Sequence, residues 1–499
     1  MTGSSTRLRR ICVGAVAALG LALLPAGASA GTVTTYTGQT KEKGSNLVSN
    51  YLIEVPSNWN KTLVLYSHGY SFGPPFGPPP PAPQAAEDAA DPVTHGWLLT
   101  NGYAIAGSSY ATTGWALQQA FQDQIAVLDV FDKRVGHHPS QTIAWGISLG
   151  GMITAGLVQQ FPNRFAGALP MCGVVAGGPG VWNQGLDSEF AFLTLQAPGA
   201  FQLDGFSSLG DGYANYLAAS TAFNLAQSTA VGQARIALSA ALADVPGWFD
   251  PTSPQPTAND YTTQEKNQLA WDNNPDLFFG FVGRAELEAR AGGNFSWNTG
   301  VDYRAQLAKS TDLAEVKALY KTAGLDLAKD LDTLNDAPRI SAKPSAVDYV
   351  TKYIAYNGDL DMPVLTMHTT GDGLVEVTDE QAYASVVKSA GDSSLLRQVF
   401  VHRAGHCAFS PAEAITAFNT LVHRIDTGHW SGTDPKSMNS QANAMGSAYN
   451  IVFIPNPTPP PTDITAAAPA SFLNFQPGQF LRPFDARNVG DEGDSGNRD

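Results

Sequence analysis

The stretch Thr142–Ile153, which reads TIAWGISLGGMI, decides the fold: two apolar runs flank a Gly-x-Ser-x-Gly pattern centred on Ser148. A strand that turns directly into a helix strains the backbone at the serine, and a side chain two residues away would clash. Gly146 and Gly150 remove that clash. The stretch therefore predicts a strand, a sharp turn and a helix, with Ser148 Oγ projecting from the top of a sheet. The bland alternative is a glycine-rich turn with an incidental serine.

Two backbone N–H groups are candidates for binding a developing oxyanion. Leu149 opens the predicted helix, so its N–H has no partner within that helix. The apolar strand expected at 61–67 ends in His68-Gly69-Tyr70. We expect the Tyr70 N–H to be the second donor, because Gly69 lets the backbone turn inward. The alternative is a plain strand-to-loop turn.

Acyl transfer by a serine needs a base within hydrogen-bond reach and a carboxylate that orients this base. Asp372 follows the apolar run 363–368, and His406 follows the apolar run 395–402. Both positions fall just past predicted strands, on the same edge of the sheet as Ser148. We therefore predict a Ser148, Asp372 and His406 triad.

Each partner of the serine has rivals in the sequence. Asp359 and Asp361 precede the strand that leads to Asp372, and Glu376 lies further into the loop. His402 lies within its strand, and His368 is expected to be structural for the same reason. We find no histidine, cysteine or carboxylate cluster with metal-ligand spacing and no phosphate-binding loop after a strand, so we expect no metal and no cofactor.

The alternation of strands and helices predicts an α/β fold with a mainly parallel sheet. On the helix expected at 116–135, the charged residues, Asp123 among them, are expected to face solvent. The expected strands are 33–36, 48–55, 61–67, 103–108, 142–147, 165–171, 363–368 and 395–402, and the expected helices are 91–101, 116–135, 149–161, 379–390 and 412–426.

The alternation breaks between about 177 and 345, where the chain is helical, loop-rich and aromatic. We predict a helical lid insertion at 177–345 between two parts of the core, 31–176 and 346–454. Most of its aromatic residues should form its own core, and the rest should line a pocket. The proline-rich stretch 73–83 is expected to be a stiff loop at the rim, and 455–499 a proline-rich connector and tail.

Residues 1–30 have the features of a secretory signal peptide: three arginines, an apolar run at 11–24 and the small residues Ala28-Ser29-Ala30. We expect cleavage near Ala30, secretion, and no stable membrane anchor, because no later apolar run is long enough. The formal charge is −15, and it is more negative still without the three arginines. That acidity disfavours nucleic acids and anionic membrane surfaces as partners.

The number of cysteines is also consistent with export. Once the signal peptide and its Cys12 are removed, Cys172 and Cys407 remain. Two cysteines in an exported protein predict one disulfide. The alternative is a pair of buried free thiols.

Four motifs together resemble the α/β-hydrolase superfamily: His68-Gly69, Gly146–Gly151, Thr370-Gly371-Asp372 and Gly405-His406-Cys407. Within this superfamily, the chain resembles exported actinobacterial serine esterases of tannase, feruloyl esterase and polyester depolymerase type. This finer resemblance rests on the expected export, the size of the insertion and the cysteine beside the histidine. The resemblance implies cleavage of a small-molecule or polymeric ester through an acyl-enzyme. A secreted serine peptidase of the same fold, or a non-catalytic binding protein on this scaffold, remains an alternative.

Overall fold

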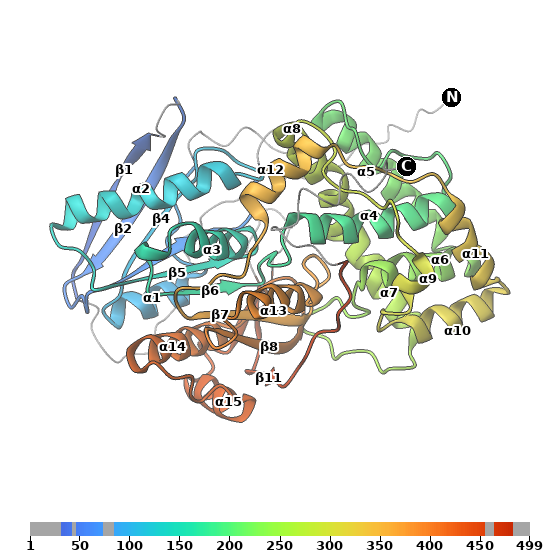
Figure 1. Cartoon of the computed structure of the whole chain (residues 1–499). Coiled ribbons are helices and arrows are strands. Elements are labelled where there is room, and N and C mark those ends of the chain that lie inside the picture. Colours follow the sequence, from blue (N-terminus) through green and yellow to red (C-terminus); the bar gives the residue numbers. More distant parts are fainter. Residues whose placement is uncertain (1–30, 42–45, 73–83, 455–463, 483–499) are drawn as a thin grey trace, which may run out of the picture.

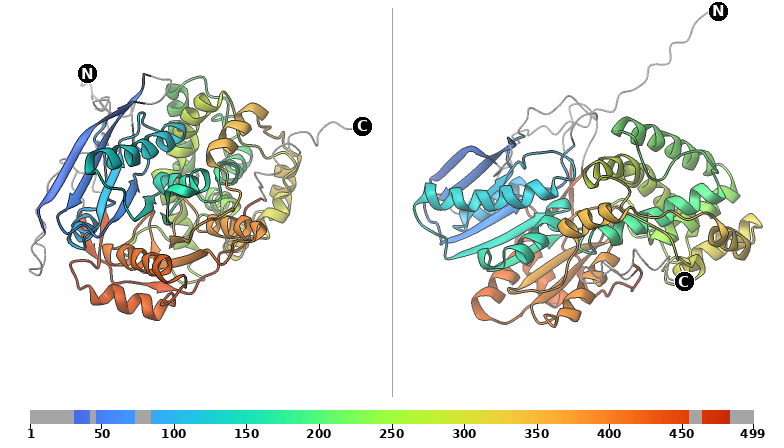
Figure 2. Two further views of the ribbon diagram at one scale, coloured as in Figure 1. Left: turned by 60° about the vertical axis from the view of Figure 1, so that its left-hand side comes forward. Right: turned by 45° about the horizontal axis from the view of Figure 1, so that its top comes forward.

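The computed structural model describes residues 31–41, 46–72, 84–454 and 464–482 of the 499-residue chain. The expected signal peptide, the loop 73–83, and most of the connector and tail lie outside the described residues. Figure 1 shows a twisted sheet flanked by helices beside a second, wholly helical part (green to yellow), and Figure 2 shows the same two parts from other directions.

A nine-stranded sheet forms the centre of the first part, in the order β1-β2-β4-β3-β5-β6-β7-β8-β11. Strands β3 to β8 run parallel, whereas β1, β2 and β11 are attached antiparallel at the two edges. The mainly parallel sheet predicted above is thus confirmed. The strands are β1 (Val33–Lys41), β2 (Val48–Pro56), β3 (Thr62–Ser67), β4 (Ala104–Ser108), β5 (Gln141–Ile147), β6 (Gly167–Met171), β7 (Val364–Gly371), β8 (Leu396–Ala404) and β11 (Phe472–Leu473), while β9 (Ile451–Ile454) pairs with β10 (Ile464–Ala467) in a separate ribbon.

Helices cover both faces of this sheet, which explains why its central strands are apolar throughout. In β3, Leu63 and Leu65 join the buried cluster on one face, and Val64 and Tyr66 join the cluster on the other. This alternation follows from the two-residue period of a strand. The first face is covered by α2 (Leu117–Val135), α3 (Leu149–Gln160), α12 (Pro344–Ile354) and α13 (Thr378–Ala390), and the second by α1 (Pro92–Thr100), α14 (Pro411–Thr427) and α15 (Pro435–Ala444).

One expectation about α2 is wrong. Asp123 does not face solvent: it is 1% exposed, and its Oδ2 accepts a hydrogen bond from the Ala111 N–H at 2.8 Å. The carboxylate satisfies a loop N–H at the inner side of the helix, which periodicity alone could not reveal.

The second part lies between β6 and β7 and contains no strand. Its own buried cluster holds Phe190, Phe192, Phe223 and Phe281. No helix in the described part of the chain is long and apolar enough to cross a membrane. The part consists of α4 (Gly178–Leu195), α5 (Leu209–Ala226), α6 (Ala230–Ala243), α7 (Tyr261–Trp271), α8 (Arg284–Ala291), α9 (Tyr303–Leu307), α10 (Leu313–Ala323) and α11 (Leu327–Asp336), with π-helical turns at Asp272–Asp276 and Phe279–Gly283. Its role as a lid stays a prediction.

Three carboxyl groups are packed together where α7 meets α10. Gln268 Nε2 donates to Glu315 Oε2 at 3.1 Å and to Asp312 Oδ2 at 3.4 Å, and Glu265 is also buried. Burial, reinforced by Asp312 and Glu265, raises the pKa of Glu315 to about 9. Burial likewise raises the pKa of Glu265 and of Asp312 to about 7. Because these pKa values exceed those of the unfolded chain, the contribution of the three carboxyls to stability is fully present below about pH 4 and is lost as pH rises towards about 9.

We therefore expect Glu315→Gln to stabilise the protein by on the order of 2 kcal/mol at about pH 9 and to change little at about pH 5. The amide keeps the shape of the side chain and cannot ionise. Thermal unfolding at both pH values measures the effect, with exposed Asp336→Asn as the control. An equal effect of Glu315→Gln at the two pH values would contradict the prediction.

Candidate active site

Ser148 occupies the sharp turn between β5 and α3, as predicted. Its backbone has a positive φ of 55° with ψ −124°, and its N–H donates to the Met171 carbonyl at 3.0 Å. A Cβ at Gly146 would lie 2.2 Å from the Gly150 carbonyl oxygen, and a Cβ at Gly150 would lie 1.9 Å from the carbonyl oxygen of Ser67. Neither position can therefore carry a side chain without moving backbone.

This packing makes Gly150→Ala strongly destabilising, by about 3 kcal/mol in the free energy of unfolding. The matched control is Gly185→Ala in α4, because a Cβ there meets nothing within 4 Å. That substitution should be neutral or stabilising, since alanine favours a helix over glycine. Urea unfolding of both variants measures the difference, and equal stabilities would show that the turn is not tightly packed.

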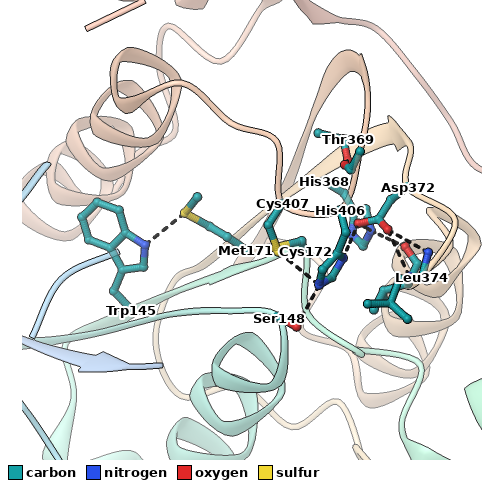
Figure 3. Close-up of a disulfide and its surroundings, with 12 residues drawn as sticks. Trp145, Ser148, Met171, Cys172, His368, Thr369, Asp372, Leu374, His406 and Cys407 are labelled. Carbon is teal, nitrogen blue, oxygen red and sulfur yellow. Dashed lines mark hydrogen bonds and ion pairs between the residues drawn. A yellow bond between two sulfur atoms is a disulfide. The ribbon is translucent and has the colours of Figure 1, made fainter. Parts of the chain in front are cut away.

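Ser148, His406 and Asp372 form one chain of hydrogen bonds (Figure 3). Ser148 Oγ lies 2.8 Å from His406 Nε2, and His406 Nδ1 lies 2.8 Å from Asp372 Oδ2. Asp372 is 1% exposed, and its Oδ1 accepts the N–H groups of Leu374 and Val375 at 3.1 Å. The arrangement positions His406 to take a proton from the serine hydroxyl.

Electrostatics keep Asp372 ionised. Burial alone would raise the pKa of Asp372, but the charges and hydrogen bonds of His406 and His368 outweigh burial and lower it to about 2. His368 is fully buried in β7, where Nε2 donates to the Val375 carbonyl at 2.8 Å and Nδ1 lies 3.3 Å from Glu380 Oε1. Burial opposes its charge, yet Asp372 and Glu380 raise the pKa of His368 to about 10. His368 is thus a buried cation beside the acid, and it makes no contact with the serine among those the structure describes.

The rival residues lie elsewhere. Asp359 and Asp361 are exposed before β7, and His402 is exposed on β8. Glu376 is buried and faces the cavity, but the hydrogen bond to His406 comes from Asp372.

The predicted disulfide between Cys172 and Cys407 is present, with the Cα atoms 5.4 Å apart. It joins the end of β6 to the loop that carries His406, and both cysteines have a positive φ, 43° and 55°. Cys407 Sγ lies 3.4 Å from His406 Nε2, the ring atom that faces Ser148 (Figure 3). The bridge therefore borders the imidazole directly.

Two groups of described residues bring possible metal ligands together. In the first, Cys172 and Cys407 stand beside His406, but the two sulfurs are bonded to each other and offer no thiolate. The second is Glu54, Asp88 and His95. There His95 Nε2 lies 2.6 Å from Glu54 Oε2, a hydrogen-bonded ion pair that is not part of the cavity beside Ser148.

The two predicted oxyanion donors, Tyr70 and Leu149, both line the cavity that contains Ser148. A Cβ added to Gly69 would lie 3.6 Å from Ser148 Cβ, so the turn after β3 runs beside the serine. His68 is buried and holds this turn, since its Nδ1 lies 2.8 Å from the Gly69 carbonyl oxygen. The N–H groups of Tyr70 and Leu149 stay predicted donors.

The cavity beside Ser148 opens to solvent, and the space within it and at its mouth amounts to about 910 Å³. The helical insertion supplies much of its wall, including the aromatic rings of Trp182 and Phe279. Sequence reasoning missed its acidic lining, which is Glu189, Asp272, Asp276 and Glu376. The available signal was the run Asp272-Asn273-Asn274-Pro275-Asp276, which has two acids and no base.

Comparisons with known proteins find one family match and one related sequence. Residues 102–177, which include the Ser148 turn, match the prolyl oligopeptidase family. An o-phthalyl amidase from Xanthobacter agilis is 29% identical over 435 residues, which cover 81% of this chain and 91% of that protein.

Two solved structures of esterases show weak overall similarity. An esterase from Aspergillus oryzae has a TM-score of 0.41 at 11% identity, covering 88% of this chain and 86% of that one. The rice cell wall degrading esterase LipA from Xanthomonas oryzae has a TM-score of 0.35 at 12% identity, covering 79% and 89%. With TM-scores this low, the two structures are not used to assign the fold, which is assigned from the strand order of this chain.

The parallel strands, with antiparallel pairs at the edges, carry the serine on the turn after β5, the acid after β7 and the histidine after β8. A sheet with that topology and that order of functional groups is the α/β-hydrolase fold.

Proposed function

We propose that this hydrolase is a secreted serine esterase that cleaves carboxylic ester bonds through an acyl-enzyme. The observation that carries the proposal is the hydrogen-bonded chain from Ser148 through His406 to the ionised Asp372, with Ser148 at the wall of a cavity.

Acylation uses the three side chains in turn. His406 Nε2 takes the proton from Ser148 Oγ as this oxygen attacks the ester carbonyl. The N–H groups of Tyr70 and Leu149 would bind the negative oxygen of the tetrahedral intermediate. Asp372 stabilises the imidazolium, which then gives its proton to the departing alcohol oxygen as the C–O bond breaks.

Deacylation repeats the sequence with water. His406 takes a proton from a water molecule that attacks the acyl carbon, and the second intermediate collapses by returning this proton to Ser148 Oγ. The products are the carboxylic acid and the regenerated serine.

Amide hydrolysis is the second candidate, because the same groups could expel an amine and the Xanthobacter relative is named an amidase. Export is also part of the proposal. The disulfide supports it, since such bonds persist in oxidising compartments.

A labelling experiment combined with a substrate panel tests the proposal. A fluorophosphonate probe should modify Ser148, as read by mass spectrometry of the labelled peptide. p-Nitrophenyl esters of graded chain length and feruloyl esters should be cleaved faster than peptide anilides or phthalyl amides. Faster cleavage of an amide would identify an amidase or peptidase, and absence of labelling would favour the non-catalytic binding protein.

A further inference from the structure

The cavity beside Ser148 has an aromatic wall. Tyr70 meets Trp115 and Phe279 edge to face at centroid distances of 5.3 Å and 5.1 Å, and Trp115 meets Trp182 at 5.5 Å. All four rings line the cavity. Such a wall offers π-faces and apolar contacts to a substrate.

Facing the same cavity is a group of four carboxyls that come from three different elements. Glu189 lies on α4, Asp272 and Asp276 lie on the turn after α7, and Glu376 lies on the loop after Asp372. Glu189, Asp272 and Glu376 are 6%, 4% and 8% exposed. We call these four residues the acidic subsite.

Several oxygens of the acidic subsite are orphaned. Among the described residues, Glu189 Oε2, Asp272 Oδ2 and both carboxyl oxygens of Asp276 are buried without a hydrogen-bond partner. A tight contact keeps the segments that carry these carboxyls together. The Trp271 ring packs on Gly373, where a Cβ would lie 2.4 Å from Trp271 Cδ2. This contact brings the turn that follows α7 against the loop that follows Asp372.

The positive charge nearby does not balance these groups. Arg284 is the only lysine or arginine of the described chain that lines the cavity. Its Nη1 donates to Ser296 Oγ at 2.6 Å and to Asn294 Oδ1 at 3.4 Å, its Nη2 donates to the Trp182 carbonyl at 3.4 Å, and Nη1 lies 3.8 Å from Glu288 Oε1. Nη1 and Nη2 are thus engaged by residues outside the acidic subsite, while Nε is buried without a hydrogen-bond partner among the described residues.

Burying four carboxyls side by side shifts their pKa values upward. Burial raises the pKa of Glu189 to about 7, although Arg284 opposes the shift. Burial and the neighbouring carboxyls raise the pKa values of Asp272, Asp276 and Glu376 well above their ordinary range. The mechanism above uses none of these four groups, so their retention in the cavity points to a ligand that compensates them.

A protonated amine fits this chemistry better than a metal ion. The acidic subsite is not among the groups of described residues whose ligand atoms are close enough to hold a metal. An ammonium group donates up to three hydrogen bonds, which the orphaned oxygens need, and the aromatic wall favours a cation over its π-faces. An anion would meet four carboxyls and a single arginine in the lining of the cavity.

We propose that Glu189, Asp272, Asp276 and Glu376 bind a protonated amino group of the substrate while Ser148 attacks its acyl carbon. The inference deepens the proposed function and rests on it, since it assigns the substrate class of the same cavity. The substrates it predicts are esters that carry a primary or secondary ammonium on an apolar body.

Rigid p-nitrophenyl benzoates test the preference without risk of cyclisation. Three series carry a 4-substituent of one, two or three methylenes that ends in ammonium, methyl or carboxylate. Each kcat/KM is divided by the rate of spontaneous hydrolysis. We expect at least one ammonium ester to exceed its methyl counterpart by about tenfold or more, as expected for a charge-assisted contact. No preference at any length, or a preference for carboxylate, would overturn the proposal.

Variants assign the effect to the acidic subsite. Glu189→Gln and Asp272→Asn should each reduce the ammonium-to-methyl ratio by about fivefold or more. Glu315→Gln, which removes a buried carboxyl that does not line the cavity, should leave this ratio unchanged. A ratio retained in both subsite variants would overturn the assignment.

Calorimetry with Ser148→Ala separates this proposal from the proposed function. 3-Phenylpropylamine should bind the variant and release protons, seen as a heat that depends on the ionisation enthalpy of the buffer, because the bound cation favours ionised carboxyls. If the amine binds the variant but the wild type cleaves no ester, the acidic subsite is supported and the proposed esterase function is contradicted. If the wild type cleaves neutral esters but the protein neither binds the amine nor prefers ammonium esters, the esterase function is supported and the acidic subsite is contradicted.

Discussion

Ser148→Ala should lower kcat by about 10⁴ or more and leave KM nearly unchanged. The hydroxyl is the only group removed, and without it His406 has no nucleophile to activate. What remains is the binding cavity and the two predicted oxyanion donors. The measurement is p-nitrophenyl ester hydrolysis, with thermal unfolding to show that the fold is intact.

Ser385→Ala is the matched control for this experiment. Ser385 is a partly buried serine on α13 that accepts a hydrogen bond from Gln381 Nε2 at 3.0 Å. Its loss should leave kcat within about twofold, as is usual for a substitution away from the site. A folded Ser148→Ala protein with kcat within about tenfold of the wild type would exclude Ser148 as the nucleophile.

Loss of the Cys172–Cys407 disulfide should lower both stability and kcat. The bond closes a loop of 235 residues, for which the chain-entropy model gives on the order of 5 kcal/mol, an upper bound. His406 stands between Gly405, whose φ is 102°, and Cys407, which is tied to the end of β6. Without the tie the imidazole moves relative to Ser148, so Cys172→Ala/Cys407→Ala should lower kcat by about tenfold to a hundredfold and raise KM less.

Reduction of the native protein should reproduce the effect of the double variant, and the same reductant should not change the variant further. Non-reduced peptide mapping by mass spectrometry shows whether the bond exists in the exported protein. Free thiols at both positions, or a double variant with native kcat and native unfolding temperature, would contradict the role assigned to the bridge.

Several parts of this protein follow from local rules. The Ser148 turn is decided by Gly146 and Gly150, because any side chain there would meet backbone. The strands of the parallel sheet are short apolar runs, because both of their faces are covered. Asp372 and His406 could be predicted because the carboxyl ends of parallel strands share one edge of the sheet.

Other features depended on which faces pack together. Asp123 has the spacing of a surface residue on α2, yet a loop N–H at Ala111 draws it inward. The two-residue strand β11 was not predicted, because its pairing with β8 joins segments about 70 residues apart and leaves no local pattern.

The acidic subsite shows most clearly what could not be predicted from the sequence. Glu189, the neighbouring Asp272 and Asp276, and Glu376 come from three separate stretches of the sequence, and each could equally have faced solvent. Only the packing of α4 and α7 against the loop that follows Asp372 turns their carboxyls into one cavity. By itself the sequence determined the fold and the serine, histidine and acid, because backbone sterics and chain order are local properties. The tertiary structure decided the lining of the cavity, because burial and mutual charge arise only when distant helices meet.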